Sequence, residues 1–175
     1  MGRKSFKLIA GVVIGSGFLF ANTSLIDQCF NGSKIACKEL SQNRQTFTQL
    51  EEKCLNQKDE KACVGVGWIL ETTKNKKEIE KFHPQAEDAC KKGNGGACFV
   101  LGGLYENSKD YHKAVELFKK ACDLGSGWGC ISLGGLYIEG AGVPANPTKA
   151  KELLKKACKL GVEKGCEFLK RIEEE

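Results

Sequence analysis

Ten cysteines arranged in five couples constrain the fold more than any other feature of this chain. Seven or eight residues separate the two members of each couple. The couples are Cys29 and Cys37, Cys54 and Cys63, Cys90 and Cys98, Cys122 and Cys130, and Cys158 and Cys166. Each couple occupies the same place in a longer repeated pattern, which indicates a cross-link that was copied together with its structural unit.

The repeated pattern extends well beyond the cysteines. Residues 114–125 return 36 positions later as residues 150–161, with most positions identical. Residues 98–105 match residues 130–137 at a spacing of 32, and the difference in spacing falls in the loop at 140–147. Length variation confined to one turn is typical of an array of helical hairpins.

Both halves of the repeated unit have the pattern of a helix. Residues 111–123 carry apolar side chains at the three-and-four spacing of a buried stripe, and Gly125 stands where a left-handed cap ends a helix. In the later copy, Asn146 is a suitable N-cap, Pro147 takes the first helical position and Gly161 ends the helix. No window shows the alternation of strands, so we expect an all-α solenoid of stacked αα-hairpins.

Glycine pairs inside the second helix of the unit require an explanation, because glycine destabilises a helix by about 0.5 to 1 kcal/mol relative to alanine. The pairs are Gly102 with Gly103 and Gly134 with Gly135. We expect the missing side chains to let a neighbouring helix approach closely.

Some copies depart from the pattern. Lys170 and Arg171 replace the glycine pair in the last helix, and Glu173 to Glu175 follow. A charged face of this kind suits a terminal capping helix that no further repeat covers. In the third copy, Pro84 follows Phe82 and His83, so we expect that helix to begin or to kink at Pro84.

The first residues have the pattern of a signal peptide. Arg3, Lys4 and Lys7 are followed by an apolar run over residues 8–20, and Ala21 offers a cleavage site. This run of roughly 13 residues is too short for a membrane anchor, which needs about 20. Asp27 and Gln28 precede Cys29, which argues against lipid attachment there.

We therefore expect a signal peptide at 1–21, an N-terminal partial repeat at 22–43 and a repeat array with a capping helix at 44–175. The expected location is the periplasm or the extracellular space, and the expected state is a monomer. Without the three cations of the signal, 24 Lys and Arg face 22 Asp and Glu. These charges are interleaved rather than clustered, which excludes a nucleic-acid or anionic-membrane partner.

The position of the cysteines favours disulfides within each couple. One member closes a helix and the other opens the next, which brings the two segments within reach of a bridge. Zinc sites need closely spaced, converging ligands, whereas His83 and His112 are solitary, so we expect no metal site and no cofactor. Complete couples leave no odd cysteine for catalysis.

These motifs resemble a known family. The Ala-Cys-x-Leu-Gly turn, the Cys-x2-Leu-Gly-Gly-Leu-Tyr helix and the Gly140-Ala141-Gly142-Val143-Pro144 loop before Lys149 and Ala150 resemble Sel-like repeats, which are related to tetratricopeptide repeats. With a cysteine couple in every unit and a signal peptide, the chain resembles the Helicobacter cysteine-rich proteins. The resemblance implies a superhelix of disulfide-linked hairpins in an exported protein.

The resemblance also implies penicillin binding and slow β-lactam hydrolysis, since members of the family are often named β-lactamase. The chain lacks the Ser-x-x-Lys, Ser-Asp-Asn and Lys-Thr-Gly motifs of serine β-lactamases. The nearest imitation is Thr148-Lys149-Ala150-Lys151, with threonine in place of serine. The sequence therefore identifies no catalytic residue.

Two functions remain open at this stage. The first is an exported scaffold whose concave face binds a peptide, a protein or a cell-wall component. The second is a weak β-lactamase, for which the resemblance is the only support. We expect Trp68, Trp128, Tyr105 and Tyr137 to be packing residues rather than ligand platforms, because each lies beside a glycine or a helix junction.

Overall fold

A computed structural model describes residues 25–29 and 33–174. The expected signal peptide at 1–21 lies outside the described residues. A short helical segment at 25–29 precedes nine longer helices in the described part of the chain. These are α2 (Lys34–Gln42), α3 (Arg44–Gln57), α4 (Glu60–Thr73), α5 (Lys76–Lys91), α6 (Gly95–Asn107), α7 (Tyr111–Asp123), α8 (Gly127–Glu139), α9 (Pro147–Lys159) and α10 (Glu163–Glu174).

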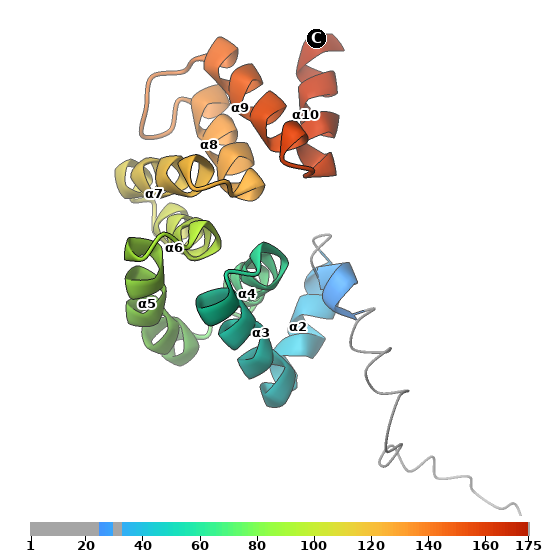
Figure 1. Cartoon of the computed structure of the whole chain (residues 1–175), viewed down its shortest axis with the longest axis vertical. Helices are drawn as coiled ribbons and strands as arrows, with labels where there is room; N and C mark the ends of the chain where they lie inside the picture. The colour runs from blue at the N-terminus through green and yellow to red at the C-terminus, as the bar shows by residue number, and fades with distance from the viewer. Residues whose placement is uncertain (1–24, 30–32, 175) are drawn as a thin grey trace, which may run out of the picture.

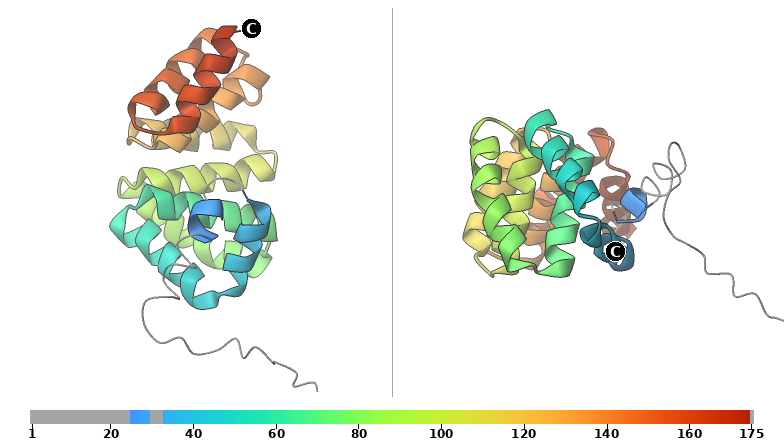
Figure 2. Two further views of the ribbon diagram at one scale, coloured as in Figure 1. Left: turned by 90° about the vertical axis from the view of Figure 1, so that its right-hand side faces the viewer. Right: turned by 90° about the horizontal axis from the view of Figure 1, so that it is seen from below.

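The helices follow one another around an open curve that runs from α2 to α10 (Figure 1). Two further views show the antiparallel hairpins stacked along the long axis of the molecule (Figure 2). The even-numbered helices α2 to α10 form the inner row, and each contacts the next member of its row. We call these the inner helices and the odd-numbered ones the outer helices.

The described residues contain no strand, which confirms the predicted all-α solenoid. The predicted ends of the repeated helices are also confirmed. Asn146 caps α9 by accepting a hydrogen bond from the Lys149 amide, with Pro147 at the first helical position. Gly125 and Gly161 adopt left-handed φ values of 90° and 85° after α7 and α9. In the described part of the chain, no helix has both the length and the apolar character needed to cross a bilayer.

Five disulfides join the same couples that the sequence singles out. They are Cys29–Cys37, Cys54–Cys63, Cys90–Cys98, Cys122–Cys130 and Cys158–Cys166, with Cα–Cα distances between 4.5 and 4.8 Å. Four of the bridges are buried, whereas the last is partly exposed. Each bridge joins the end of one helix to the first turns of the next, and therefore fixes the angle between an outer helix and the following inner helix.

Gly102 serves the predicted role of letting a neighbouring helix approach, because a Cβ atom added to it would lie 2.5 Å from Cδ1 of the buried Phe118. A Cβ atom added to Gly134 would lie 3.5 Å from the Ala150 carbonyl oxygen, which is ordinary van der Waals contact, so the approach there does not require glycine. A Cβ atom on Gly103 or Gly135 would meet nothing within 4 Å. The expectation for the second glycines is therefore wrong, because successive residues on a helix point about 100° apart and these two face open space.

Of the two alternatives expected for the third helix, a start at Pro84 is wrong. Helix α5 begins at Lys76, where Asn75 accepts a hydrogen bond from the Glu78 amide, and continues through Pro84. Proline in a helix interior removes one backbone hydrogen bond and costs about 3 kcal/mol. Phe82 is completely buried just before the proline, and this packing offsets the loss.

The caps of the inner helices also connect neighbouring hairpins. Ser33, Asp59, Asn94 and Ser126 each stand four residues before the second cysteine of a couple and cap α2, α4, α6 and α8. Asn94 is almost fully buried, and its Nδ2 donates to the Cys54 carbonyl oxygen at 2.6 Å. One side chain therefore caps α6 and holds α3 of the preceding hairpin.

We predict that Asn94→Ala lowers the free energy of unfolding by about 2 to 3 kcal/mol, because the cap and a buried hydrogen bond are lost together. Asn94→Asp keeps the acceptor for the cap but cannot donate to Cys54 when ionised, so we expect it to destabilise the protein at neutral pH. The control is Asn146→Ala, an exposed cap whose loss costs about 1 kcal/mol. Denaturant unfolding of the oxidised protein measures all three, and equal effects for Asn94→Ala and Asn146→Ala would contradict the double role.

Glu60 ties together two inner helices that are separated by a whole hairpin. Its Oε1 accepts a hydrogen bond from the Ser126 hydroxyl at 2.8 Å and another from the Trp128 amide at 3.2 Å. The carboxylate of α4 therefore lies at the N-terminus of α8, where the helix dipole favours negative charge. These two hydrogen bonds connect α4 directly to the N-terminus of α8.

Candidate ligand-binding groove

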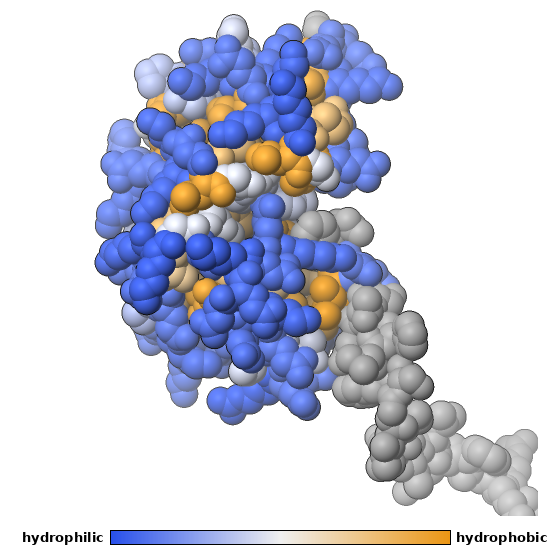
Figure 3. Space-filling view, viewed as in Figure 1, coloured by the Kyte–Doolittle hydropathy of each residue, from blue (hydrophilic) through white to orange (hydrophobic). Residues whose placement is uncertain are grey.

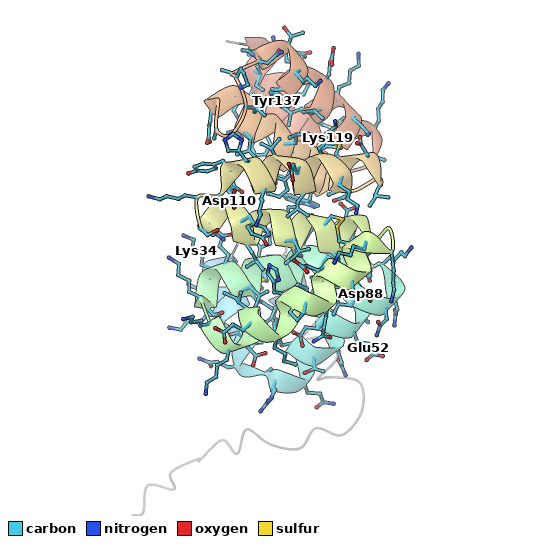
Figure 4. All side chains as sticks on the ribbon, turned by 90° about the vertical axis from the view of Figure 1, so that its left-hand side faces the viewer. Lys34, Glu52, Asp88, Asp110, Lys119 and Tyr137 are labelled. Carbon is cyan, nitrogen blue, oxygen red and sulfur yellow. A yellow bond between two sulfur atoms is a disulfide. The ribbon has the colours of Figure 1, made fainter. Side chains whose placement is uncertain are left out.

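The inner curve contains a groove of about 470 Å³, lined by residues of α4, α6, α8 and α10 with Phe118 behind them. We call it the concave groove. Apolar side chains are exposed in the hollow between the N-terminal and C-terminal halves of the curve (Figure 3). The opposite, convex side is covered by charged side chains that point to solvent, among them Glu52, Asp88 and Lys119 (Figure 4). A volume of this size is in the usual range for ligand sites in proteins.

Aromatic rings form much of the groove wall. One comes from each of the four inner helices: Trp68, Phe99, Trp128 and Phe168. Phe99 is held by Phe118, whose ring centroid lies 6.0 Å away. Rings of this kind combine a large apolar surface with low side-chain entropy, so they bind ligands at a small ordering cost.

Both tryptophans of the chain line the groove, although the sequence indicated packing alone. They do pack against the core clusters, and each remains partly exposed. The indole Nε1 of Trp68 is buried without a hydrogen-bond partner in the described structure. The repeat shows that Trp68 and Gly103 occupy equivalent positions, because each stands five residues after the second cysteine of its couple, Cys63 or Cys98. This equivalence was the available sequence signal that Trp68 belongs to the groove.

Gly103 shows why that position matters. It lines the groove, and a Cβ atom added there would meet no protein atom within 4 Å. The absence of a side chain therefore leaves room in front of α6 rather than allowing helices to approach. Trp68 fills the equivalent place on α4, so the groove is open in its middle and walled at its side.

Carboxylates stand at one end of the groove. Glu71, Glu106 and Glu139 lie in the last turns of α4, α6 and α8, and the first two line the groove. Burial raises the pKa of Glu106, and the negative charges of Glu139 and Glu71 raise this pKa further. None of the three carboxylates forms a salt bridge with a basic residue in the described part of the chain.

The Thr-x-x-Lys segment and the two histidines do not line the groove. Thr148, Lys149 and Lys151 are exposed in the first turn of α9 and do not line the groove. His83 packs against the Tyr105 ring at 5.7 Å, and His112 is exposed on α7. Among the described residues, no three His, Cys, Asp or Glu side chains converge as ligands for a metal ion.

Comparison with known proteins identifies the repeats. The Sel1 repeat model matches residues 129–162 and a tetratricopeptide repeat model matches residues 95–124. The solved structure of Helicobacter pylori cysteine rich protein B is similar to the chain with a TM-score of 0.57 and 30% sequence identity. The similarity covers 78% of this chain and 97% of that chain. No curated protein sequence gives a significant match.

The matched ranges also place the disulfides relative to the repeat. Residues 129–162 comprise most of α8, the following loop and α9, so the family unit is an inner helix followed by an outer helix. Cys130 and Cys158 lie inside this unit, while their partners Cys122 and Cys166 lie outside it. Each of these bridges therefore links consecutive family units instead of closing a single one.

The repeats, the structural match over almost the whole of the compared protein and the five bridges lead to one assignment. The chain belongs to the Helicobacter cysteine-rich protein family of Sel-like repeat proteins.

Proposed function

We propose that this protein is an exported scaffold that binds a peptide segment of a partner in the concave groove. The observation that carries the proposal is the apolar groove itself, which collects aromatic side chains from four successive inner helices. Repeat proteins of this type bind proteins or peptides, and their concave surfaces serve as the binding site. The described structure offers no catalytic constellation in the groove wall.

The proposal includes export to the periplasm or the extracellular space. Five disulfides persist in oxidising compartments, whereas cytosolic thiols are kept reduced. We propose that residues 1–21 are removed as a signal peptide, that 22–43 form a partial repeat and that 44–175 form the array with its capping helix. Mass spectrometry of the protein recovered from culture supernatant and periplasm identifies the mature N-terminus and the compartment.

The tryptophans give a direct test of the binding site. Because Trp68 and Trp128 both line the groove and the chain has no other tryptophan, intrinsic fluorescence reports on the groove. We predict that peptides selected from a random library on the oxidised protein change this fluorescence at saturation. The change should shrink in Trp68→Phe and in Trp128→Phe.

A groove-filling variant is the matched control. Gly103→Leu places a side chain in the open middle of the groove, where its Cβ atom meets no protein atom within 4 Å, so we expect the fold to be kept while the space is reduced. We expect the selected peptides to bind this variant at least about tenfold more weakly, the effect of a loss of about 1.4 kcal/mol. Selection that yields the same peptides with unchanged affinity on Gly103→Leu would show that the groove is not the binding site.

The competing enzymatic function can be tested on the same preparation. A chromogenic cephalosporin detects β-lactam turnover, and a labelled penicillin followed by gel electrophoresis detects a covalent adduct. Turnover that is lost on substitution of a single groove residue would favour an enzyme over a scaffold.

A further inference from the structure

The chemistry of the groove indicates which class of peptide it binds. Helices α4, α6 and α8 each carry a glutamate in the last turn and have no basic residue there. The outer helices α5, α7 and α9 do carry lysine there. Because the C-terminus of a helix is the negative end of its dipole, acidic side chains are unfavourable at that place.

The resulting negative charge is not neutralised within the described structure. Glu106 is partly buried, and Glu71 and Glu139 act on it as like charges from the neighbouring helices. The side chains do not converge tightly enough for a metal ion, since no metal-ligand cluster is found among the described residues. A larger organic cation, such as an ammonium or guanidinium group, matches carboxylates on three different helices.

The remaining wall of the groove favours apolar side chains. Phe99, Ile131 and Phe168 line it beside the two tryptophans. A cation on an aromatic ring already occurs beside this wall, because the Arg171 guanidinium lies 5.3 Å from the Phe168 centroid. The glutamates that line the groove, Glu71 and Glu106, belong to α4 and α6, so a cationic ligand group is directed to that end.

We propose that the occupant of the groove is a peptide segment that carries a lysine or arginine next to bulky apolar residues. The cationic group lies between the carboxylates of Glu71, Glu106 and Glu139, and the apolar side chains lie on Phe99, Ile131 and Phe168. This proposal rests on the proposed peptide-binding function and specifies the ligand for the same groove. Charge complementarity of this type fixes the orientation of a ligand and excludes acidic competitors.

The test compares two selections from one random peptide library. The first uses the oxidised protein, and the second uses the variant Glu71→Gln/Glu106→Gln/Glu139→Gln, which keeps the size of each side chain. We expect lysine and arginine beside aromatic or branched residues to be enriched in the first selection and not in the second. Glu116→Gln on the outer helix α7 is the control and should give the same peptides as the unmodified protein.

Synthetic peptides then measure the charge directly. The best peptide is compared with a version in which citrulline, which is neutral and has nearly the same shape, replaces arginine. We expect a loss of about tenfold or more in affinity for the protein, since hydrogen bonds to charged groups contribute about 1.5 to 3 kcal/mol. The triple variant should bind both peptides with the same affinity.

The outcomes separate the two proposals. Selected peptides without basic residues that still fail to bind Gly103→Leu would overturn the cationic ligand and leave the groove as the binding site. Equal affinity of the arginine and citrulline peptides would also overturn the cationic ligand and leave the groove as the binding site. If the selection on the oxidised protein enriches no peptide beyond what the same selection on Gly103→Leu enriches, both proposals are overturned.

Discussion

Reduction of the disulfides is expected to unfold the protein at room temperature without added denaturant. Each bridge closes a loop of about nine residues, for which the chain-entropy model gives about 2.5 kcal/mol. Five bridges therefore contribute on the order of 12 kcal/mol, which is comparable with the whole stability of a domain of this size. Circular dichroism with and without a reducing agent measures the loss of helix.

The bridges should not react at the same rate. Cys158–Cys166 is partly exposed between α9 and the terminal helix α10, while the other four are buried. We expect the terminal bridge to be reduced first, with fraying of α10 before the rest of the array unfolds. A fully reduced protein that keeps its helical signal and its thermal transition would show that packing alone holds the superhelix.

Two neighbouring glycines are expected to respond to the same substitution with opposite signs. Gly102→Ala places a methyl group 2.5 Å from Cδ1 and 2.6 Å from Cε1 of Phe118, which is completely buried and cannot move aside. Overpacking of this kind costs about 1 to 3 kcal/mol. Gly103→Ala meets no atom and should stabilise α6 by about 0.5 to 1 kcal/mol.

Denaturant unfolding of both variants in the oxidised state measures the difference, which should reach about 1.5 to 4 kcal/mol between adjacent positions. The double variant Gly102→Ala/Phe118→Leu tests the cause, since a smaller side chain at 118 relieves the contact. Equal changes in stability at positions 102 and 103 would contradict the packing of α6 on α7 described above.

The sequence predicted those parts of the fold that the repeat copies faithfully. The 36-residue and 32-residue spacings, the cap at Asn146 and the left-handed Gly125 and Gly161 all depend on local interactions that each copy contains. Local patterns of this kind are sufficient for an array in which each unit contacts mainly its neighbours. The all-helical superhelix therefore followed from residues close together in the chain.

The groove depends on contacts between copies, and these were not predicted. Trp68 and Gly103 occupy equivalent places, but only the curvature of the inner row reveals that both face the same open space. Glu60 likewise accepts a hydrogen bond from Ser126 across a separation of 66 residues, a contact between copies that no local pattern indicates. The sequence left open whether the third helix begins at Pro84 or runs through it, because the outcome depends on the tertiary burial of Phe82.

The sequence also did not reveal how the glutamates are distributed between the inner and the outer helices. Acids and bases are interleaved along the chain, and this pattern argued against a nucleic-acid or anionic-membrane partner without marking any charged site. The fold sorts them, because Glu71, Glu106 and Glu139 lie in the last turns of α4, α6 and α8, while lysines lie in the last turns of the outer helices α5, α7 and α9. Acidic and basic residues that alternate along the chain are therefore separated in space, with the glutamates on inner helices and the lysines on outer helices.

Peptide mapping of the native, unreduced protein tests the central claim most directly. Trypsin cuts between the two cysteines of four couples, after Lys34, after Lys58 and Lys61, after Lys91 and Lys92, and after Lys159 and Lys164. Cys122 and Cys130 have no Lys or Arg between them. This couple needs chymotrypsin, which cuts after Leu124 or Trp128. Our account predicts five cross-linked products, one for each couple, and no free thiol. Free cysteines in the native protein, or bridges that join different couples, would contradict it.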